Sequence, residues 1–232
     1  MVQDVALLTI LFDYPVHAYP LCYNNASKFF DQKDIHIARF NNLLQEGSYY
    51  DKLYFYKVEK LLEYITDNIY GKYRYILFLD AKDTNFYKSP IDIVEKFTAL
   101  DRSIIFGAEK GLWPNTDYTH LYDKKVGADD AKYLNSGTYF GYTDQIITHL
   151  TRIKTERYQE GIDDQGKWTI EYLLHDDIIL DYKRQFFFST FEARNFVDGI
   201  DNTKLKGISP YIVHDNGPFG DATVKIAHLL TL

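Results

Sequence analysis

The feature that most constrains this chain is an apolar run, Tyr75–Leu79, that ends in two carboxylates, Asp80 and Asp83. Five apolar or aromatic residues bounded by charge are typical of a strand buried on both faces of a sheet. Asp80 and Asp83 then lie at its carboxyl end, the edge where open α/β sheets bind ligands. Two carboxylates there suit Mg²⁺ or Mn²⁺, with positions left for phosphate oxygens. The alternative is an ordinary turn, because Asp favours turns and N-caps.

Strand and helix signals alternate along the first half of the chain. Apolar residues recur at helical spacing over residues 58–69, which predicts a helix against the sheet. Ser89-Pro90 predicts the start of another helix that ends near Leu100. The resulting β-α-β-α-β-α-β order predicts a single α/β domain with a mostly parallel central sheet flanked by helices. The other expected strands are residues 5–11, 35–39 and 104–106, with helical stretches at 22–30 and 143–157.

The second half is less regular and carries more polar residues. A strand-like segment, residues 134–142, contains Asn-Ser-Gly, which indicates either backbone close to a ligand or a β-bulge. Asp163 and Asp164 begin a predicted helix that ends near Leu174, a position where carboxylates are usually caps. His214 lies where a short strand meets a turn, and a lone histidine is more often structural than a ligand.

Composition argues against several classes of partner and site. The net charge is −7, whereas a nucleic-acid backbone needs clustered Lys and Arg. Cys22 is the single cysteine, which excludes an intramolecular disulfide and a cysteine zinc site. No window approaches the roughly 20 apolar residues of a membrane span. The N-terminus lacks the basic and apolar regions of a signal peptide. We therefore expect a soluble cytoplasmic protein.

Six short segments, in order, resemble the glycosyltransferase domain of the procollagen lysyl hydroxylases and its free-standing relatives, which are nucleotide-sugar transferases of the GT-A type. With the strand end at Leu8 and Thr9, the resemblance covers about residues 5–220, nearly the whole chain. The resemblance implies a nucleotide-binding half at about 1–110 and an acceptor and catalytic half at about 111–232. The segments are Phe78-Leu79-Asp80 with Asp83, Phe106-Gly107-Ala108-Glu109 followed by Trp113-Pro114, Leu134-Asn135-Ser136-Gly137, Asp163-Asp164-Gln165, Leu180-Asp181, and His214-Asp215-Asn216-Gly217-Pro218.

The resemblance implies a set of donor-binding residues. Asp80, Asp83 and His214 resemble the family's Mn²⁺ ligands, and the cation would neutralise charge on a UDP leaving group. Lys57 matches a family lysine near the nucleotide, although an exposed charge on an amphipathic helix is the simpler alternative. The remaining nucleotide contacts implied are Leu8 and Thr9 at the strand end that receives uridine, Gly217 in the late turn, and Lys225.

The resemblance also implies the catalytic residues. Asp163 and Asp164 resemble an acidic pair that faces the transferred sugar, and Asn135 an amide near it. Trp113 resembles an aromatic residue of the sugar or acceptor cleft, with a core tryptophan as the alternative. A carboxylate beside the anomeric carbon can stabilise an oxocarbenium-like state, orient the acceptor, or attack as a nucleophile, and the sequence leaves all three open.

Three departures from the family pattern bear on these roles. Leu112 replaces a cysteine of the hydroxylase domains, and Thr138 replaces a second glycine. Phe219-Gly220 occupies the place of a Thr-Lys pair, which removes a phosphate contact that Lys225 could replace.

The resemblance implies a Mn²⁺-dependent retaining transferase that moves glucose from UDP-glucose to a galactosyl-hydroxylysine acceptor. One alternative keeps the fold but uses UDP-galactose or another glycan acceptor. An alternative of another class is a non-catalytic module that binds nucleotide sugars or glycans.

Overall fold

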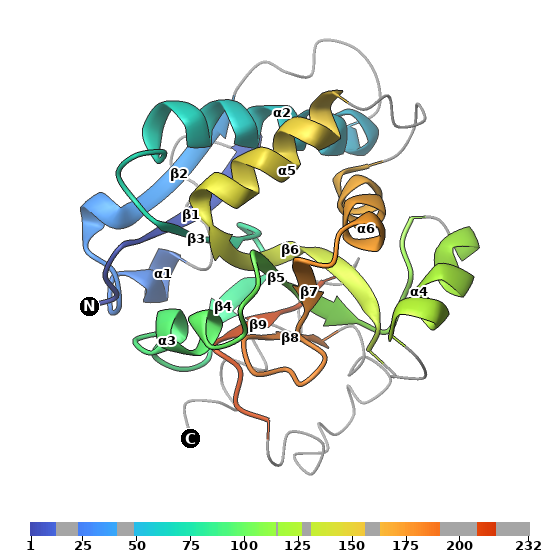
Figure 1. The fold of residues 1–232 in the computed structure, drawn as a ribbon. Coiled ribbons are helices and arrows are strands. Elements are labelled where there is room, and N and C mark those ends of the chain that lie inside the picture. Colours follow the sequence, from blue (N-terminus) through green and yellow to red (C-terminus); the bar gives the residue numbers. More distant parts are fainter. Residues whose placement is uncertain are drawn as a thin grey trace.

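A six-stranded sheet forms the centre of the molecule in the computed structural model (Figure 1). The structure describes residues 1–12, 23–40, 49–114, 116–126, 131–155, 163–190 and 208–216. The strand order is β2-β1-β3-β6-β5-β7. The strands are β1 (Val5–Phe12), β2 (Ile35–Phe40), β3 (Tyr75–Leu79), β5 (Ile104–Glu109), β6 (Tyr133–Tyr142) and β7 (Ile178–Leu180).

Five of the six strands point in the same direction. β1 pairs in parallel with β2 and β3, and β5 pairs in parallel with β7. β6 runs antiparallel to both of its neighbours, β3 and β5, and separates them. The α/β class and the mostly parallel sheet are therefore confirmed, with one central strand reversed. The pattern of residues 134–142 predicted a strand, but it carries no information on strand direction, which depends on the path of the preceding segment.

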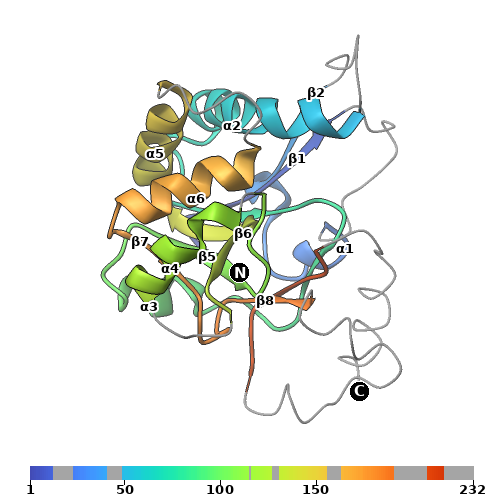
Figure 2. The ribbon, with the colours of Figure 1, turned by 90° about the vertical axis from the view of Figure 1, so that its right-hand side faces the viewer.

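Helices cover both faces of the sheet (Figures 1 and 2). α2, α5 and α6 lie on one face, and α1 and α3 lie on the other with a small second sheet. The helices are α1 (Tyr23–Ala26), α2 (Tyr49–Asn68), α3 (Ile93–Thr98), α4 (Thr119–Val126), α5 (Thr143–Thr155) and α6 (Asp164–Leu174), with short 3₁₀ turns at Gln32–Asp34 and Thr116–Tyr118.

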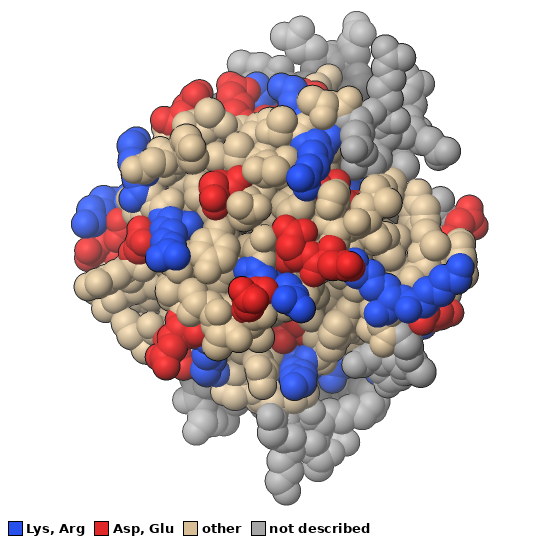
Figure 3. Space-filling view, viewed as in Figure 1, with Lys and Arg blue, Asp and Glu red and all other residues tan. Residues whose placement is uncertain are grey.

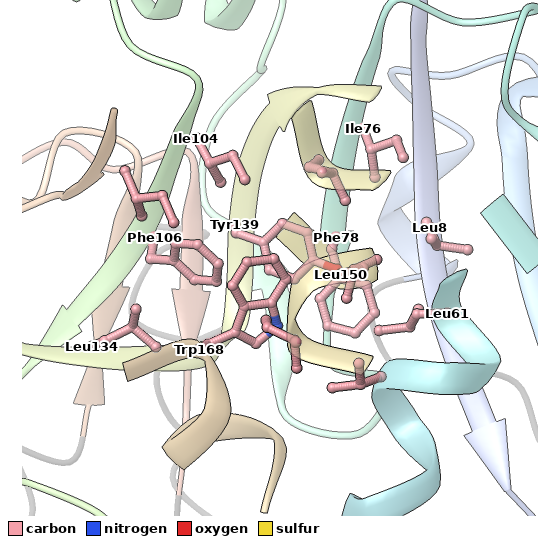
Figure 4. Close-up of a cluster of buried hydrophobic side chains, with 14 of the residues drawn as sticks. Leu8, Leu61, Ile76, Phe78, Ile104, Phe106, Leu134, Tyr139, Leu150 and Trp168 are labelled. Atoms are coloured by element: carbon pink, nitrogen blue, oxygen red, sulfur yellow. The ribbon is translucent and has the colours of Figure 1, made fainter. Parts of the chain in front are cut away.

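Aromatic side chains fill the core beneath α2, α5 and α6 (Figure 4). Phe78 of β3 stacks on Tyr139 of β6, with ring centroids 4.7 Å apart. Trp168 of α6 lies 4.9 Å from Phe106 of β5 and is almost completely buried. A buried tryptophan contributes a large apolar area. It therefore holds α6, and with it the helix start at Asp164, in a fixed place above the sheet.

The second sheet joins the end of the chain to the segment after β3. It has the order β4-β9-β8, formed by β4 (Thr84–Phe86), β9 (Ile212–His214) and β8 (Phe187–Ser189). β9 is antiparallel to β4, and His214 lies opposite Thr84. The backbone N–H of Asp215 donates to the carbonyl of Asp83 at 2.7 Å. This pairing places His214 beside the acidic end of β3.

Two predicted helix limits differ from the structure, and a third lies outside the described residues. α3 begins at Ile93 with Asp92 at the N-cap, because Pro90 forms a turn in which its carbonyl accepts from the Ile93 N–H. The helix expected at 22–30 is limited to α1, and residues 21 and 22 lie outside the described ranges. The helix expected at 143–157 is described only as far as Thr155. The helix start at Asp163-Asp164 is confirmed.

Charges of both signs are spread over the surface. On the face shown in Figure 3, Lys and Arg side chains are interspersed with Asp and Glu among uncharged residues. Within the described ranges, no helix combines the length and apolar character needed to cross a membrane.

Candidate active site

Two carboxylates and an imidazole converge at the carboxyl end of β3. Asp80 follows β3 directly, Asp83 precedes β4, and His214 ends β9. Their potential ligand atoms all lie within 4.8 Å of one another. His214 Nε2 lies 3.3 Å from Asp83 Oδ1 and 3.9 Å from Asp80 Oδ2. The structure therefore brings together the three residues predicted to bind a metal.

The environment of His214 fits a metal ligand. Its Nε2 is buried and makes no well-formed hydrogen bond within the described structure. Its Nδ1 lies 3.0 Å from Asn135 Oδ1, so that Nδ1–H can donate to this amide and leave Nε2 as the ligating nitrogen. Burial lowers the pKa of His214, but the Asp83 and Asp80 carboxylates outweigh it and raise this pKa. A cation held by both carboxylates would take the place of that proton.

Gly137 allows the side chains of His214 and Asp80 to lie close to the backbone of β6. A Cβ atom added at Gly137 would lie 2.3 Å from His214 Cε1 and 2.6 Å from Asp80 Oδ2, which no side chain tolerates. The Gly137 carbonyl accepts from the Asp80 N–H at 2.8 Å, so the two backbones are also joined here. The glycine within β6 is thus explained by the side chains that cross its face.

Lys57 bridges the candidate metal ligands to the helix start of α6. Its Nζ lies 3.0 Å from Asp80 Oδ1 and 2.9 Å from Asp164 Oδ2. Burial lowers the pKa of Lys57, but Asp164 and Asp80 outweigh it and raise this pKa, so the ammonium stays charged. The alternative of an exposed surface charge is wrong, because only 5% of the residue is exposed. A fixed positive charge therefore lies between the two acidic sites.

Asp163 and Asp164 have different surroundings. Asp163 is the N-cap of α6, where Oδ1 accepts from the Gly166 N–H at 2.8 Å and Oδ2 accepts from Trp113 Nε1 at 2.7 Å. Asp164 is buried and accepts from Ser136 Oγ at 2.9 Å as well as from Lys57. Burial, with the neighbouring Asp164 charge, raises the pKa of Asp163. The cap interpretation of Asp163 is confirmed, and it does not conflict with a role in binding.

Trp113 lies at the surface beside this helix start. It is 62% exposed, so the alternative of a core tryptophan is wrong. Because Asp163 holds its indole N–H, the ring has a defined position from which it can contact a ligand.

Glu109 belongs to one of the resembling segments, but no role was predicted for it, and the structure places it next to the candidate site residues. It ends β5, is buried, and accepts hydrogen bonds from Gln165 Nε2 at 2.8 Å and from Asn216 Nδ2. Burial raises the pKa of Glu109 to about 7. Gln165 Oε1 also accepts from the Ser136 N–H at 3.2 Å, which connects Glu109 to the strand that carries Asn135. The signal was available, because Glu109, like Asp80, is an acidic residue at the end of an apolar run.

Of the other predicted nucleotide contacts, only Leu8 and Thr9 are among the residues that the structure describes. The Leu8 side chain belongs to the core, so its predicted contact with uridine would involve the backbone. Thr9 is buried, and its hydroxyl has no hydrogen-bond partner in the described ranges. Both lie on β1, which pairs with β3 next to Asp80. Gly217 and Lys225 lie outside the described residues, and their roles stay predictions.

Two of the sequence departures have a structural explanation. Leu112 is partly buried and packs against the core beside the site. Thr138 is buried in β6, and its Oγ1 lies against Gly107. A Cβ atom added at Gly107 would lie 2.5 Å from this oxygen.

Asp181 belongs to another of the resembling segments. Its carboxylate accepts hydrogen bonds from the backbone N–H groups of residues 185–187, so it stabilises a turn.

Comparison with known proteins gives a consistent picture. The model of the PLOD GT domain family matches residues 49–224. An uncharacterized protein of Acanthamoeba polyphaga mimivirus, R699, is 30% identical over 162 residues, which cover 68% of this chain and 33% of R699. The procollagen-lysine,2-oxoglutarate 5-dioxygenase of Drosophila melanogaster is 28% identical over 156 residues, 61% of this chain and 21% of that enzyme. This chain thus spans about a third and a fifth of these two relatives.

The fold has a solved counterpart. A glycosyltransferase involved in the glycosylation of the major capsid of PBCV-1 superimposes with a TM-score of 0.53 over 97% of this chain and 98% of its own, at 12% identity. That likeness concerns the fold. The family match covers three quarters of the sequence and includes every side chain of the Asp80, Asp83 and His214 cluster. The chain belongs to the PLOD GT domain family and is a glycosyltransferase.

Proposed function

We propose that this glycosyltransferase uses a UDP-sugar donor and a divalent cation, Mn²⁺, held by Asp80, Asp83 and His214. The observation that carries the proposal is the buried His214 Nε2, which lies between two carboxylates at the carboxyl end of β3 and makes no well-formed hydrogen bond within the described residues. Bound there, the cation would supply charge neutralisation for the diphosphate leaving group. Its mixed oxygen and nitrogen ligands suit Mn²⁺ better than Mg²⁺, which prefers oxygen ligands alone.

The protein residues around the cation have separable roles in this proposal. Lys57 fixes the positions of the Asp80 and Asp164 carboxylates through its two ion pairs and contributes positive charge beside the diphosphate. Asp164, anchored by Ser136, is the carboxylate placed to act on the developing charge at the anomeric carbon. Asp163 positions Trp113, whose exposed ring would cover the sugar or acceptor. Asn135 keeps His214 in the required tautomer.

For the substrates we propose glucose transfer from UDP-glucose to a galactosyl-hydroxylysine acceptor, with retention of anomeric configuration. The support is family membership together with a relative named procollagen-lysine,2-oxoglutarate 5-dioxygenase. UDP-galactose is the alternative donor, and another glycan is the alternative acceptor. The two donors differ in the orientation of one hydroxyl, which a site can distinguish strongly if it hydrogen-bonds that group.

The first experiment tests the cation. UDP binding is measured by calorimetry on EDTA-treated protein with and without Mn²⁺, for the parent and for Asp83→Asn. We expect Mn²⁺ to be required for tight binding, and the variant to lose that dependence. Asp31→Asn, which removes an exposed carboxylate with no capping bond, is the matched control and should behave as the parent. Equal UDP affinity with and without Mn²⁺ in the parent would refute the cation site.

The second experiment tests the chemistry and the substrates. Asp164→Asn should lower kcat far more than it weakens UDP binding, whereas Asp163→Asn keeps a good N-cap and should retain more activity. Initial rates with UDP-glucose and UDP-galactose, and NMR of the product linkage, identify the donor and the stereochemistry. Mn²⁺-dependent UDP binding without turnover on these acceptors would refute the proposed substrates.

A further inference from the structure

A second group of side chains that could bind a metal ion lies away from the candidate active site. His149 belongs to α5, Glu171 to α6, and His175 is the C-cap of α6. Their potential ligand atoms lie within 4.8 Å of one another. α5 and α6 lie side by side (Figures 1 and 2). Glu171 is seven residues beyond Asp164 on the same helix, which separates the two sites by roughly 10 Å along α6.

The donor set is that of a transition metal site with nitrogen and oxygen ligands. Glu171 and His175 are four residues apart, so they occupy the same face of α6. His175 Nε2 lies 3.3 Å from Glu171 Oε1, and His149 Nδ1 lies 2.7 Å from the same oxygen. Ligands at about 2.0–2.1 Å from a tetrahedral Zn²⁺ are about 3.3 Å apart. The distance from His175 to Glu171 already fits this value, whereas the His149 and Glu171 ligand atoms would have to move apart by a few tenths of an ångström.

His149 also has the outer partner that a metal-bound histidine needs. Its second ring nitrogen, Nε2, lies 3.1 Å from Asp177 Oδ2. A carboxylate that accepts from the far ring N–H fixes the tautomer and the orientation of a ligating imidazole. His149 is buried, whereas the His175 and Asp177 side chains are 32% and 42% exposed. The group is thus preorganised inside and open to solvent on one side.

The Arg152 guanidinium lies close to the same ligand atoms and would compete with a bound cation. Its Nη1 lies 3.6 Å from Glu171 Oε1 and 3.5 Å from His149 Nδ1. Its side chain is 43% exposed, so it can withdraw into water when a cation with two positive charges arrives. An ion-pair network without metal is the competing explanation for the same four side chains.

We propose that His149, Glu171 and His175 bind Zn²⁺, or a transition metal ion of similar preference, which fastens the end of α6 to α5. The three protein ligands leave one tetrahedral position for water. The site does not depend on the proposed UDP-sugar chemistry. It would hold the helix whose other end carries Asp164, and so would act on the stability of the catalytic helix.

The test uses a parent chain with Asp83→Asn, so that the first cluster does not bind the added metal. Zn²⁺ binding is measured by calorimetry, and the thermal midpoint is measured in buffered Zn²⁺. At a free Zn²⁺ concentration about a hundred times the dissociation constant, we expect the midpoint to rise by about 5–10 °C. His175→Ala should abolish both the binding and the shift. His120→Ala removes an exposed histidine elsewhere and should leave both unchanged.

Two further measurements separate a metal site from an ion-pair network. Co²⁺ should give the intense visible absorption of tetrahedral coordination in the parent and lose it in His175→Ala. Arg152→Gln removes the competing charge and should tighten Zn²⁺ binding several-fold. The proposal is overturned if Zn²⁺ produces no shift in the parent, or if His175→Ala responds as the parent does. Because His175 is partly exposed and its capping bond uses the backbone, His175→Ala is expected to fold.

Discussion

Replacement of Lys57 by methionine is the sharpest test of the electrostatics of the site. Methionine keeps the length and apolar contacts of the side chain and removes only the ammonium. In the parent this ammonium lies 2.9 Å from Asp164 Oδ2 and 3.0 Å from Asp80 Oδ1. The Asp164 side chain is only 5% exposed, whereas that of Asp80 is 33% exposed and is partly screened by water. Asp164 is therefore the carboxylate that the substitution leaves uncompensated.

The expected loss of stability is large. Removing one partner of a buried ion pair costs about 3–5 kcal/mol, because the other charge stays in a poorly solvated place. For a domain of this size that corresponds to a fall in thermal midpoint of about 6–20 °C. Lys60→Met is the matched control, one turn along the same helix, where Lys60 pairs with the exposed Glu63. That surface pair should contribute at most about 0.5 kcal/mol.

A double-mutant cycle identifies the cause. Asp164→Asn introduced into Lys57→Met removes the uncompensated charge and should recover about 1–3 kcal/mol of the unfolding free energy. Urea denaturation of the four proteins at one pH gives the coupling energy. A loss below about 1 kcal/mol in Lys57→Met, or a double variant no more stable than Lys57→Met, would refute a stabilising buried bridge.

Three other outcomes follow from the same geometry. Gly137→Ala should abolish Mn²⁺-dependent UDP binding in calorimetry, since its Cβ would lie 2.3 Å from His214 Cε1, and unchanged affinity would contradict the cluster. The pKa of Glu109 is raised from 4.5 to about 7 by burial, so the stability that this proton contributes is present below about pH 4.5 and is lost as the pH rises through 7. In urea titrations of metal-free protein, Glu109→Gln should remove a fall of about 3 kcal/mol between about pH 5 and 8, and parallel pH profiles would contradict this. Trp113→Phe keeps an aromatic ring but loses the hydrogen bond to Asp163. The free energy of unfolding, from thermal melts, should therefore fall by less than about 1 kcal/mol while kcat/KM falls, and unchanged transfer rates would exclude Trp113 from the site.

Local patterns in the sequence were sufficient for the parts of the site that one element determines. The apolar run that ends at Asp80 predicted β3 and its acidic end, because a strand buried on both faces leaves no place for charge until it stops. Asp163 predicted the start of α6, since its carboxylate satisfies a backbone N–H of the first turn. The α/β class followed from the alternation of such elements.

Local sequence patterns did not predict the contacts between distant segments, although the family resemblance had grouped Asp80, Asp83 and His214. The antiparallel pairing of β4 with β9 brings His214 to Asp83 from the other end of the chain, and strand sequences do not encode their partners. The burial of Lys57 depends on the two carboxylates that α6 and β3 bring to it, because an unpaired ammonium would stay in water. The sequence thus determined which residues can carry charge and where elements begin. Only the tertiary packing decided which charged side chains are buried and which of them form ion pairs, because their desolvation depends on neighbours far away along the chain.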